Sequence, residues 1–200
     1  ELNYKYILNT EINKHINYDE YVNENTQIFE KYHLLKSFIL SEQEFISQYS
    51  YIWLPDNDVS ISTEDINKMF LLAEQYKLLL AQPAMIGHVS HRITLPQPNT
   101  LLRFTNFVEV LAPLMSLDTL MLVKDTFDEN YSGWGYDFLW PYLLEYPQDK
   151  IAILDSIIMK HTKPVGTDYS RFPIHPSLES EEMLRRLTTN LNTEQKEYSK

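Results

Sequence analysis

Cysteine is absent from this sequence of 200 residues, and glycine occurs only four times. Without cysteine the chain has no disulfide framework and no thiolate chemistry. Long apolar runs are missing as well: none approaches the length of a membrane span, and no secretion signal is visible. We therefore expect no transmembrane segment in this chain and a cytoplasmic location, either free or peripheral to a membrane.

The sequence is also poor in basic residues, with 17 Lys and Arg residues against 28 Asp and Glu residues. The resulting net charge of −11 argues against nucleic acid as a partner, since broad binding to it needs Lys and Arg to displace phosphate counterions. A polyphosphate ligand is compatible with this charge, because one divalent cation can reverse the local field. Hydrophobic residues make up 44% of the chain, which is enough for one domain with its own core.

The hydrophobic pattern predicts short strands separated by helices. We expect strands at residues 4–8, 51–55, 78–81 and 151–159. We expect helices at 29–51 with a break near 41, at 62–76, from 116 or 118 to 133, at 137–145 and at 181–191. This order indicates an α/β domain with a mainly parallel or mixed sheet. Residues 1–172 would form the core, and the more polar residues 173–200 a C-terminal helical appendage.

Two acids follow the predicted strand at 51–55 directly. Asp56 and Asp58 can present carboxylate oxygens to one hard divalent ion, Mg²⁺ or Mn²⁺, with positions left open for a diphosphate. In α/β sheets, ligands collect at the carboxyl ends of strands, where these acids lie. The alternative is a solvated turn, because Asp and Asn are common turn residues.

A histidine stands at the far end of the last predicted strand. His161 is flanked by Lys160 and Lys163, so it is a candidate ligand for a metal or a phosphate. The alternative is a surface or packing histidine without a ligand.

Two of the four glycines bracket a tryptophan in the segment from Gly133 through Trp134 and Gly135 to Asp137. Glycine on both sides frees the backbone, so the large ring can project into a cleft while an acid follows at a helix start. The alternative is a helix end followed by a new helix start, with Trp134 in the core.

Glu109 interrupts the apolar run 107–112. A carboxylate on a buried element is costly unless it is paired or functional. If the element is only half-buried, Glu109 simply faces water.

These segments, taken in order, resemble one known family, the glycosyltransferase-like family catalogued as domain of unknown function 707. The matching segments are 51–58 (YIWLPDND), 80–84 (LAQPA), 106–113 (NFVEVLAP), 133–140 (GWGYDFLW), and 153–155 (ILD) with 161–166 (HTKPVG). Five ordered matches over residues 30–166 are more specific than any single motif.

The resemblance implies a GT-A-like three-layer fold, with a central mainly parallel or mixed sheet flanked by helices. In that fold an Asp-x-Asp turn holds a metal ion, Mn²⁺ or Mg²⁺, against the diphosphate of the donor. Asp56 and Asp58 match this turn, and His161 matches the histidine that completes the metal site.

The same resemblance implies roles for the other candidates. Asp137 matches the base that takes a proton from the acceptor hydroxyl, and Glu109 would lie near the acceptor pocket. Substrate-binding roles fall to Trp134, Gly135, Lys160 and Lys163, with the two lysines assisting the departing phosphates.

The function that follows is transfer of a sugar from a nucleotide-sugar donor to a hydroxyl group of a carbohydrate acceptor, in polysaccharide or glycoconjugate synthesis. Two alternatives stay open: a catalytically silent carbohydrate-binding or scaffolding module, and a nucleotide-sugar hydrolase. GT-A domains normally open with a strand that helps to hold the nucleotide base, and residues 4–8 would be the second strand of that layout. We therefore expect an N-terminal segment outside this sequence, or self-association along the uncovered edge.

Overall fold

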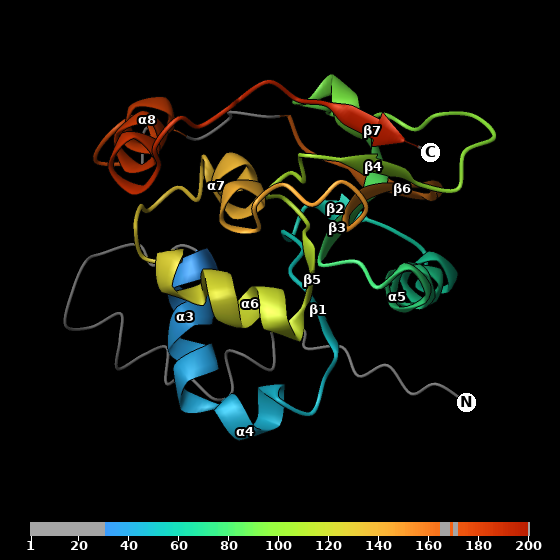
Figure 1. Cartoon of the computed structure of the whole chain (residues 1–200), viewed down its shortest axis with the longest axis horizontal. Coiled ribbons are helices and arrows are strands. Elements are labelled where there is room, and N and C mark those ends of the chain that lie inside the picture. The colour runs from blue at the N-terminus through green and yellow to red at the C-terminus, as the bar shows by residue number, and fades with distance from the viewer. Residues whose placement is uncertain (1–30, 165–168, 170–171, 200) are drawn as a thin grey trace.

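The computed structural model describes residues 31–164, 169 and 172–199, and these form an α/β unit around a mixed sheet (Figure 1). The strands pair in the order β1-β5-β3-β6-β4-β7, and β2 also pairs with β6. They are β1 (Tyr51–Trp53), β2 (Val59–Ser60), β3 (Leu80–Gly87), β4 (Arg103–Thr105), β5 (Leu114–Ser116), β6 (Ile151–His161) and β7 (Glu197–Ser199). The strand expected at residues 4–8 lies outside the described residues.

Helices cover both faces of this sheet. One apolar cluster joins α5 (Thr63–Tyr76) to β3 and β6, and a second joins the remaining helices to the opposite face. These helices are α3 (Lys31–Ser41), α4 (Gln43–Ile46), α6 (Leu117–Val123), α7 (Tyr136–Leu143) and α8 (Pro176–Leu187). The α/β class is therefore confirmed.

The sheet is mixed rather than mainly parallel. Among the described strand pairs, only β3 with β6 is parallel, and the others are antiparallel. The antiparallel pairs all include β2, β4, β5 or β7, which are only two or three residues long. Strands this short carry too few residues for a clear alternation, so the sequence pattern did not predict β4 and β5.

Local signals place several helices correctly. The predicted break near Ser41 separates α3 from α4. Helix α5 begins after its N-cap residue Ser62, whose hydroxyl accepts a hydrogen bond from the amide of Asp65. Helix α6 ends at Val123 and passes into a 3-10 turn (Lys124–Thr126), so the helix expected to reach residue 133 is shorter. Residues 88–99 contain a second 3-10 turn, Arg92–Thr94, and no strand.

The strand predicted at 78–81 was too short. The strand continues to Gly87 because β6, which runs from Ile151 to His161, pairs with its whole length. Between Pro83 and Ala84 the register shifts, so three residues of β6 (155–157) have no partner on β3. A proline in a central strand is tolerated at such a bulge, where no ladder hydrogen bond is needed from it.

The C-terminal residues are not only a helical appendage. Helix α8 lies near its predicted place, but β7 then pairs with β4 and extends the sheet. Arg103 on β4 holds this arrangement: its side chain is 1% exposed and donates to Asp155 Oδ2 at 2.9 Å and to Glu197 on β7. The same guanidinium donates to the carbonyl groups of Ile93 and Leu95. A buried cation with all these partners ties the C-terminal strand to the core.

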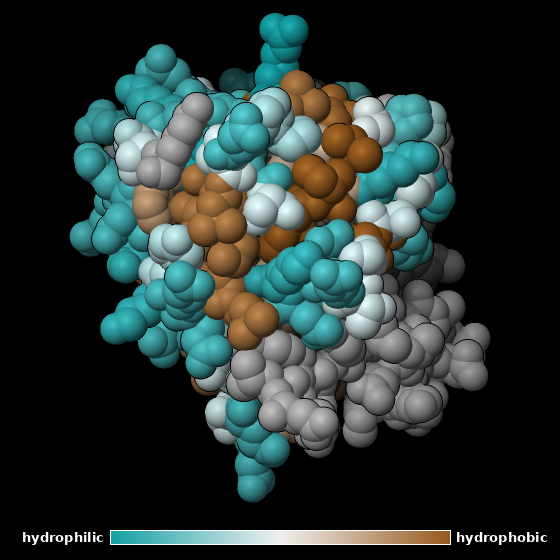
Figure 2. Space-filling model, turned by 90° about the vertical axis from the view of Figure 1, so that its right-hand side faces the viewer, coloured by the Kyte–Doolittle hydropathy of each residue, from teal (hydrophilic) through white to brown (hydrophobic). Residues whose placement is uncertain are grey.

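The face in Figure 2 is the side that carries α5 in Figure 1, and it shows apolar groups divided by polar side chains. Exposed apolar residues of the chain include Leu71 on α5 and Leu101 before β4. Within the described part of the chain, no helix is long and apolar enough to cross a membrane.

We predict that Arg103→Met lowers the free energy of unfolding by about 3–5 kcal/mol, because it leaves the buried carboxylate of Asp155 without its cation. Urea denaturation measures this change. Arg185→Met is the control, since Arg185 pairs with Glu182 on the exposed face of α8 and its loss is expected to cost less than about 0.5 kcal/mol. Equal effects of the two substitutions would contradict the structural role of Arg103.

Candidate functional site

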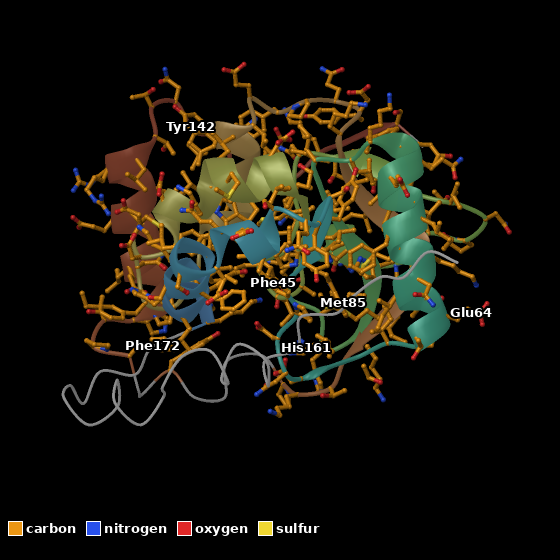
Figure 3. All side chains as sticks on the ribbon, turned by 90° about the horizontal axis from the view of Figure 1, so that it is seen from below. Phe45, Glu64, Met85, Tyr142, His161 and Phe172 are labelled. Atoms are coloured by element: carbon orange, nitrogen blue, oxygen red, sulfur yellow. The ribbon has the colours of Figure 1, made fainter. Side chains whose placement is uncertain are left out.

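A cleft of about 590 Å³ lies where the turn after β1, the end of β6 and the start of α7 meet. This volume lies within the usual range of small-molecule binding sites. All the residues predicted to bind metal or to act as acid or base line it, as do Trp134 and Gly135. In Figure 3, His161 and Phe172, which both line the cleft, lie on the same side of the molecule.

Asp58 and His161 are brought together by strand pairing. Val59 of β2 is the register partner of His161, and the amide of Thr162 donates to the carbonyl of Asp58 at 2.9 Å. His161 Nε2 lies 3.4 Å from Asp58 Oδ2, while its Nδ1 lies 2.6 Å from the carbonyl oxygen of His88. A carbonyl only accepts, so Nδ1 carries a proton and donates it.

A positive charge would therefore stabilise the contact between Nε2 and the carboxylate. In a neutral ring, Nε2 is an acceptor, and two acceptors face each other without a proton between them. Either a proton on the ring or a cation held between the two groups resolves this. Asp58 Oδ1 is also buried and has no hydrogen-bond partner. A histidine that donates through Nδ1 to a carbonyl and offers Nε2 is a common arrangement in metal sites.

Asp56 has a different partner. Its Oδ1 accepts from Lys31 Nζ at 2.9 Å, and the same ammonium group lies 3.3 Å from the carbonyl oxygen of Val110. Burial lowers the pKa of Lys31, and the charges of Asp56 and Asp58 oppose this. Lys31 at the start of α3 was not among the predicted site residues, because one lysine at the start of a predicted helix carries no distinguishing signal.

The three predicted metal ligands thus share the cleft but do not form a ready-made cage. Within the described residues, no group of three or more acidic or histidine side chains is close enough to hold a metal ion alone. Asp58 and His161 supply two ligands of the kind that Mn²⁺ and Mg²⁺ accept, with Asp56 beside them. Such ions usually retain water and take further ligands from phosphate groups, so two protein ligands fit.

Glu109 is buried rather than facing water, with 6% of its surface exposed. Its backbone amide donates to the side chain of Gln82 on β3, which fixes the turn between β4 and β5. Its Oε2 has no hydrogen-bond partner. Burial, with help from the nearby charge of Asp137, raises the pKa of Glu109 to about 8, against a hydrogen bond from Ser90. Its carboxyl group is therefore mostly protonated at pH 7.

Asp137 stands in the first turn of α7 and lines the same cleft as Asp58. Burial raises its pKa to about 7, although the backbone N–H groups of Asp137, Phe138 and Gly135 act in the opposite direction. Its Oδ1 is buried without a hydrogen-bond partner. A carboxyl group with a pKa near neutrality and a free oxygen in a cleft is suited to accept a proton.

The glycines around Trp134 serve both the backbone and the cleft. Gly135 has a φ of 92° and is the N-cap of α7, and a Cβ there would lie 2.4 Å from Ser180 Oγ on α8. Trp134 is 36% exposed, lines the cleft and packs edge-on against Tyr169, with ring centroids 5.4 Å apart. The expected projection of the ring into a cleft is confirmed, and Trp134 is not a core residue.

Lys160 and Lys163 are exposed, and neither is among the described residues that line the cleft. Neighbouring residues of a strand point to opposite faces, so Lys160 faces away from the side on which His161 meets Asp58. The sequence pattern also missed His91, which lies 3.7 Å from Asp137 through its Nε2. His91 lies in the loop after β3, and it is close to α7 only in the folded chain.

No protein-family model, curated protein or solved structure matches this chain significantly. The function of this chain is therefore inferred from the cleft itself.

We predict that Glu109→Gln becomes more stable relative to the wild type as the pH rises from 5 to 8. The folded wild type holds a proton on Glu109 up to about pH 8, whereas the unfolded chain loses it near 4.5, so the wild type loses stability across this window. The variant has no such proton, and we expect a relative gain of about 3–4 kcal/mol. Urea denaturation at several pH values measures it.

Glu64→Gln is the control, because Glu64 is an exposed residue of α5, pairs with Lys68 and lies away from His161 in Figure 3. Its pKa is lowered by Lys68, so this variant is expected to show no gain with rising pH. A difference between Glu109→Gln and wild type that stays constant from pH 5 to 8 would refute the buried, protonated state.

Proposed function

We propose that this protein is a metal-dependent glycosyltransferase of the GT-A type, which moves a sugar from a nucleotide diphosphate to a hydroxyl group of a carbohydrate. The observation that carries the proposal is the composition of the cleft. It contains two hydrogen-bond acceptors that face each other and would be stabilised by a cation, His161 Nε2 and Asp58 Oδ2, and also two carboxyl groups of raised pKa, those of Glu109 and Asp137. A cation at Asp58 and His161 would stabilise a departing diphosphate, and the two carboxyl groups are suited to proton transfer from the hydroxyl group of the sugar acceptor.

Asp58 and His161 would hold Mn²⁺ or Mg²⁺, with Asp56 adjacent. Bound there, the ion supplies positive charge that stabilises the departing nucleotide diphosphate. The cleft needs this charge, because four carboxyl groups line it and Lys31 is the one Lys or Arg among the described lining residues. Without a cation, Asp56 and Asp58 would repel a diphosphate.

Asp137 would act as the base. It takes the proton of the acceptor hydroxyl while that oxygen bonds to the anomeric carbon and the bond from this carbon to the donor phosphate breaks. The electron pair of the broken bond stays on the phosphate. A base is most effective when its pKa is near the working pH, and the pKa of Asp137 is about 7.

Glu109 has the complementary state. Protonated at pH 7, it can donate a hydrogen bond to a sugar oxygen through an oxygen that has no partner in the protein. Two carboxyl groups with different protonation states divide the roles of donor and base in one cleft. The ring of Trp134 at the rim offers an apolar surface for a sugar face.

We predict that Asp137→Asn reduces sugar transfer by about 10²–10⁴-fold and leaves nucleotide binding nearly unchanged, because it removes the base and no ligand of the diphosphate. Asp58→Asn is expected to weaken nucleotide binding and transfer together. The assay measures nucleotide release from a panel of uridine and guanosine diphosphate sugars with Mn²⁺, with and without an oligosaccharide mixture as acceptor.

The outcomes separate the functions. Release that depends on the acceptor supports the transferase, whereas equal release without acceptor identifies a nucleotide-sugar hydrolase. Saccharide binding without any release identifies a silent carbohydrate-binding module. Loss of binding and turnover to the same degree in Asp137→Asn would refute the role of this residue as base.

A further inference from the structure

A row of three side chains ends at the carboxyl group of Asp137. His91 Nε2 lies 3.7 Å from Asp137 Oδ2, and its ring packs on the buried Phe107 with centroids 4.6 Å apart. On its other side, His91 Nδ1 lies 2.8 Å from the side-chain amide nitrogen of Gln195. The row therefore joins the loop after β3, the start of α7 and the segment before β7.

The contact with Gln195 determines which nitrogen of His91 carries the proton. An amide nitrogen only donates, so His91 Nδ1 must accept and carries a lone pair. Burial lowers the pKa of His91, which keeps the ring neutral, and a neutral ring with a free Nδ1 has its proton on Nε2. This Nε2–H group faces Asp137 Oδ2.

Gln195 is itself held in place through the backbone on both sides. The side-chain amide of Asn106 donates to the carbonyl of Glu194 at 2.8 Å, and its oxygen accepts from the amide of Lys196 at 2.7 Å. Strand β7 follows at once and pairs with β4. The two hydrogen bonds of Asn106 thus hold the C-terminal segment where Gln195 contacts His91.

We propose that His91, oriented by Gln195, is a positioning residue for Asp137: it engages Oδ2 and leaves Oδ1 as the oxygen that takes the acceptor proton. Asp137 Oδ1 is buried without a partner, whereas Oδ2 faces the ring. The inference rests on the proposed transferase function, in which Asp137 is the base. The other titratable groups whose charges interact with Asp137 are Glu109 and Tyr32.

The pH dependence of the reaction follows from this contact. The positive end of the Nε2–H dipole, 3.7 Å from Asp137 Oδ2, favours the charged carboxylate, so His91 lowers the pH at which Asp137 becomes a base. Without His91, a higher pH is needed for the same fraction of charged Asp137.

The test compares sugar transfer by three variants of the full chain over pH 6–9. His91→Phe keeps an aromatic ring on Phe107 but lacks the N–H group, and we expect about tenfold slower transfer at pH 7, partly recovered at pH 9, with an unchanged KM for the donor. His91→Gln offers an amide N–H near the place of Nε2 and should recover part of the rate. His33→Phe is the control, because His33 stacks on Tyr131 and does not line the cleft.

A second measurement is independent of activity. The ¹⁵N resonances of His91, assigned by their loss in His91→Phe, report the tautomer of the ring at pH 8. We expect the Nε2–H form in the wild type and loss of this preference in Gln195→Leu.

Three results would overturn the inference. One is an Nδ1–H tautomer in the wild type, and another is a His91→Phe rate equal to that of His33→Phe at every pH. The third is a rate loss that comes only from a raised donor KM. A wild type that transfers no sugar would instead overturn the proposed function, and with it the role of Asp137 on which this inference depends.

Discussion

The parallel pairing of β3 with β6 is the interaction on which the cleft depends. It runs from Leu80 beside Ile151 to Gly87 beside His161, and its two strands contribute residues to all three apolar clusters of the described chain. At its last pair the strands are so close that a Cβ on Gly87 would lie 2.4 Å from the carbonyl oxygen of His161. Gly87 also has a φ of 89°, which favours glycine. Any side chain there would separate the strands and move His161 away from Asp58.

The cleft holds four carboxyl groups, and the fold accommodates each one differently. Asp56 is paired with the ammonium group of Lys31, burial keeps Glu109 mostly protonated at pH 7, and Asp137, with a pKa of about 7, is protonated only part of the time. Asp58 has one buried oxygen without a partner and another beside His161. The uncompensated position is therefore the one beside a histidine nitrogen, where we propose that the cation binds. An uneven distribution of protonation states around one cleft is typical of sites that transfer protons.

The sequence predicted the parts of this structure that depend on neighbouring residues. Ser62 marked the start of α5, and the polar turn at 56–58 marked the end of β1 to within two residues. The candidates Asp56, Asp58, Glu109, Asp137 and His161 all line the cleft. The missed features depend on pairing between distant segments. The two carboxylate partners of Arg103 lie on β6 and β7, far from it in the sequence. The partner of His91, Asp137, lies on α7, which is also remote in the sequence from the loop after β3. Lys160 was misplaced because the alternation of β6 turns it away from the cleft.

The central claim is that a divalent cation between Asp58 and His161 makes this acidic cleft bind a nucleotide diphosphate. Calorimetric titration of the wild-type chain with UDP and GDP, in Mn²⁺ and in EDTA, tests it most directly. We predict binding of at least one diphosphate in Mn²⁺, loss of that binding in EDTA, and at least tenfold weaker binding by Asp58→Asn in Mn²⁺. Equal affinity in Mn²⁺ and EDTA, or an Asp58→Asn variant that binds like the wild type, would contradict it.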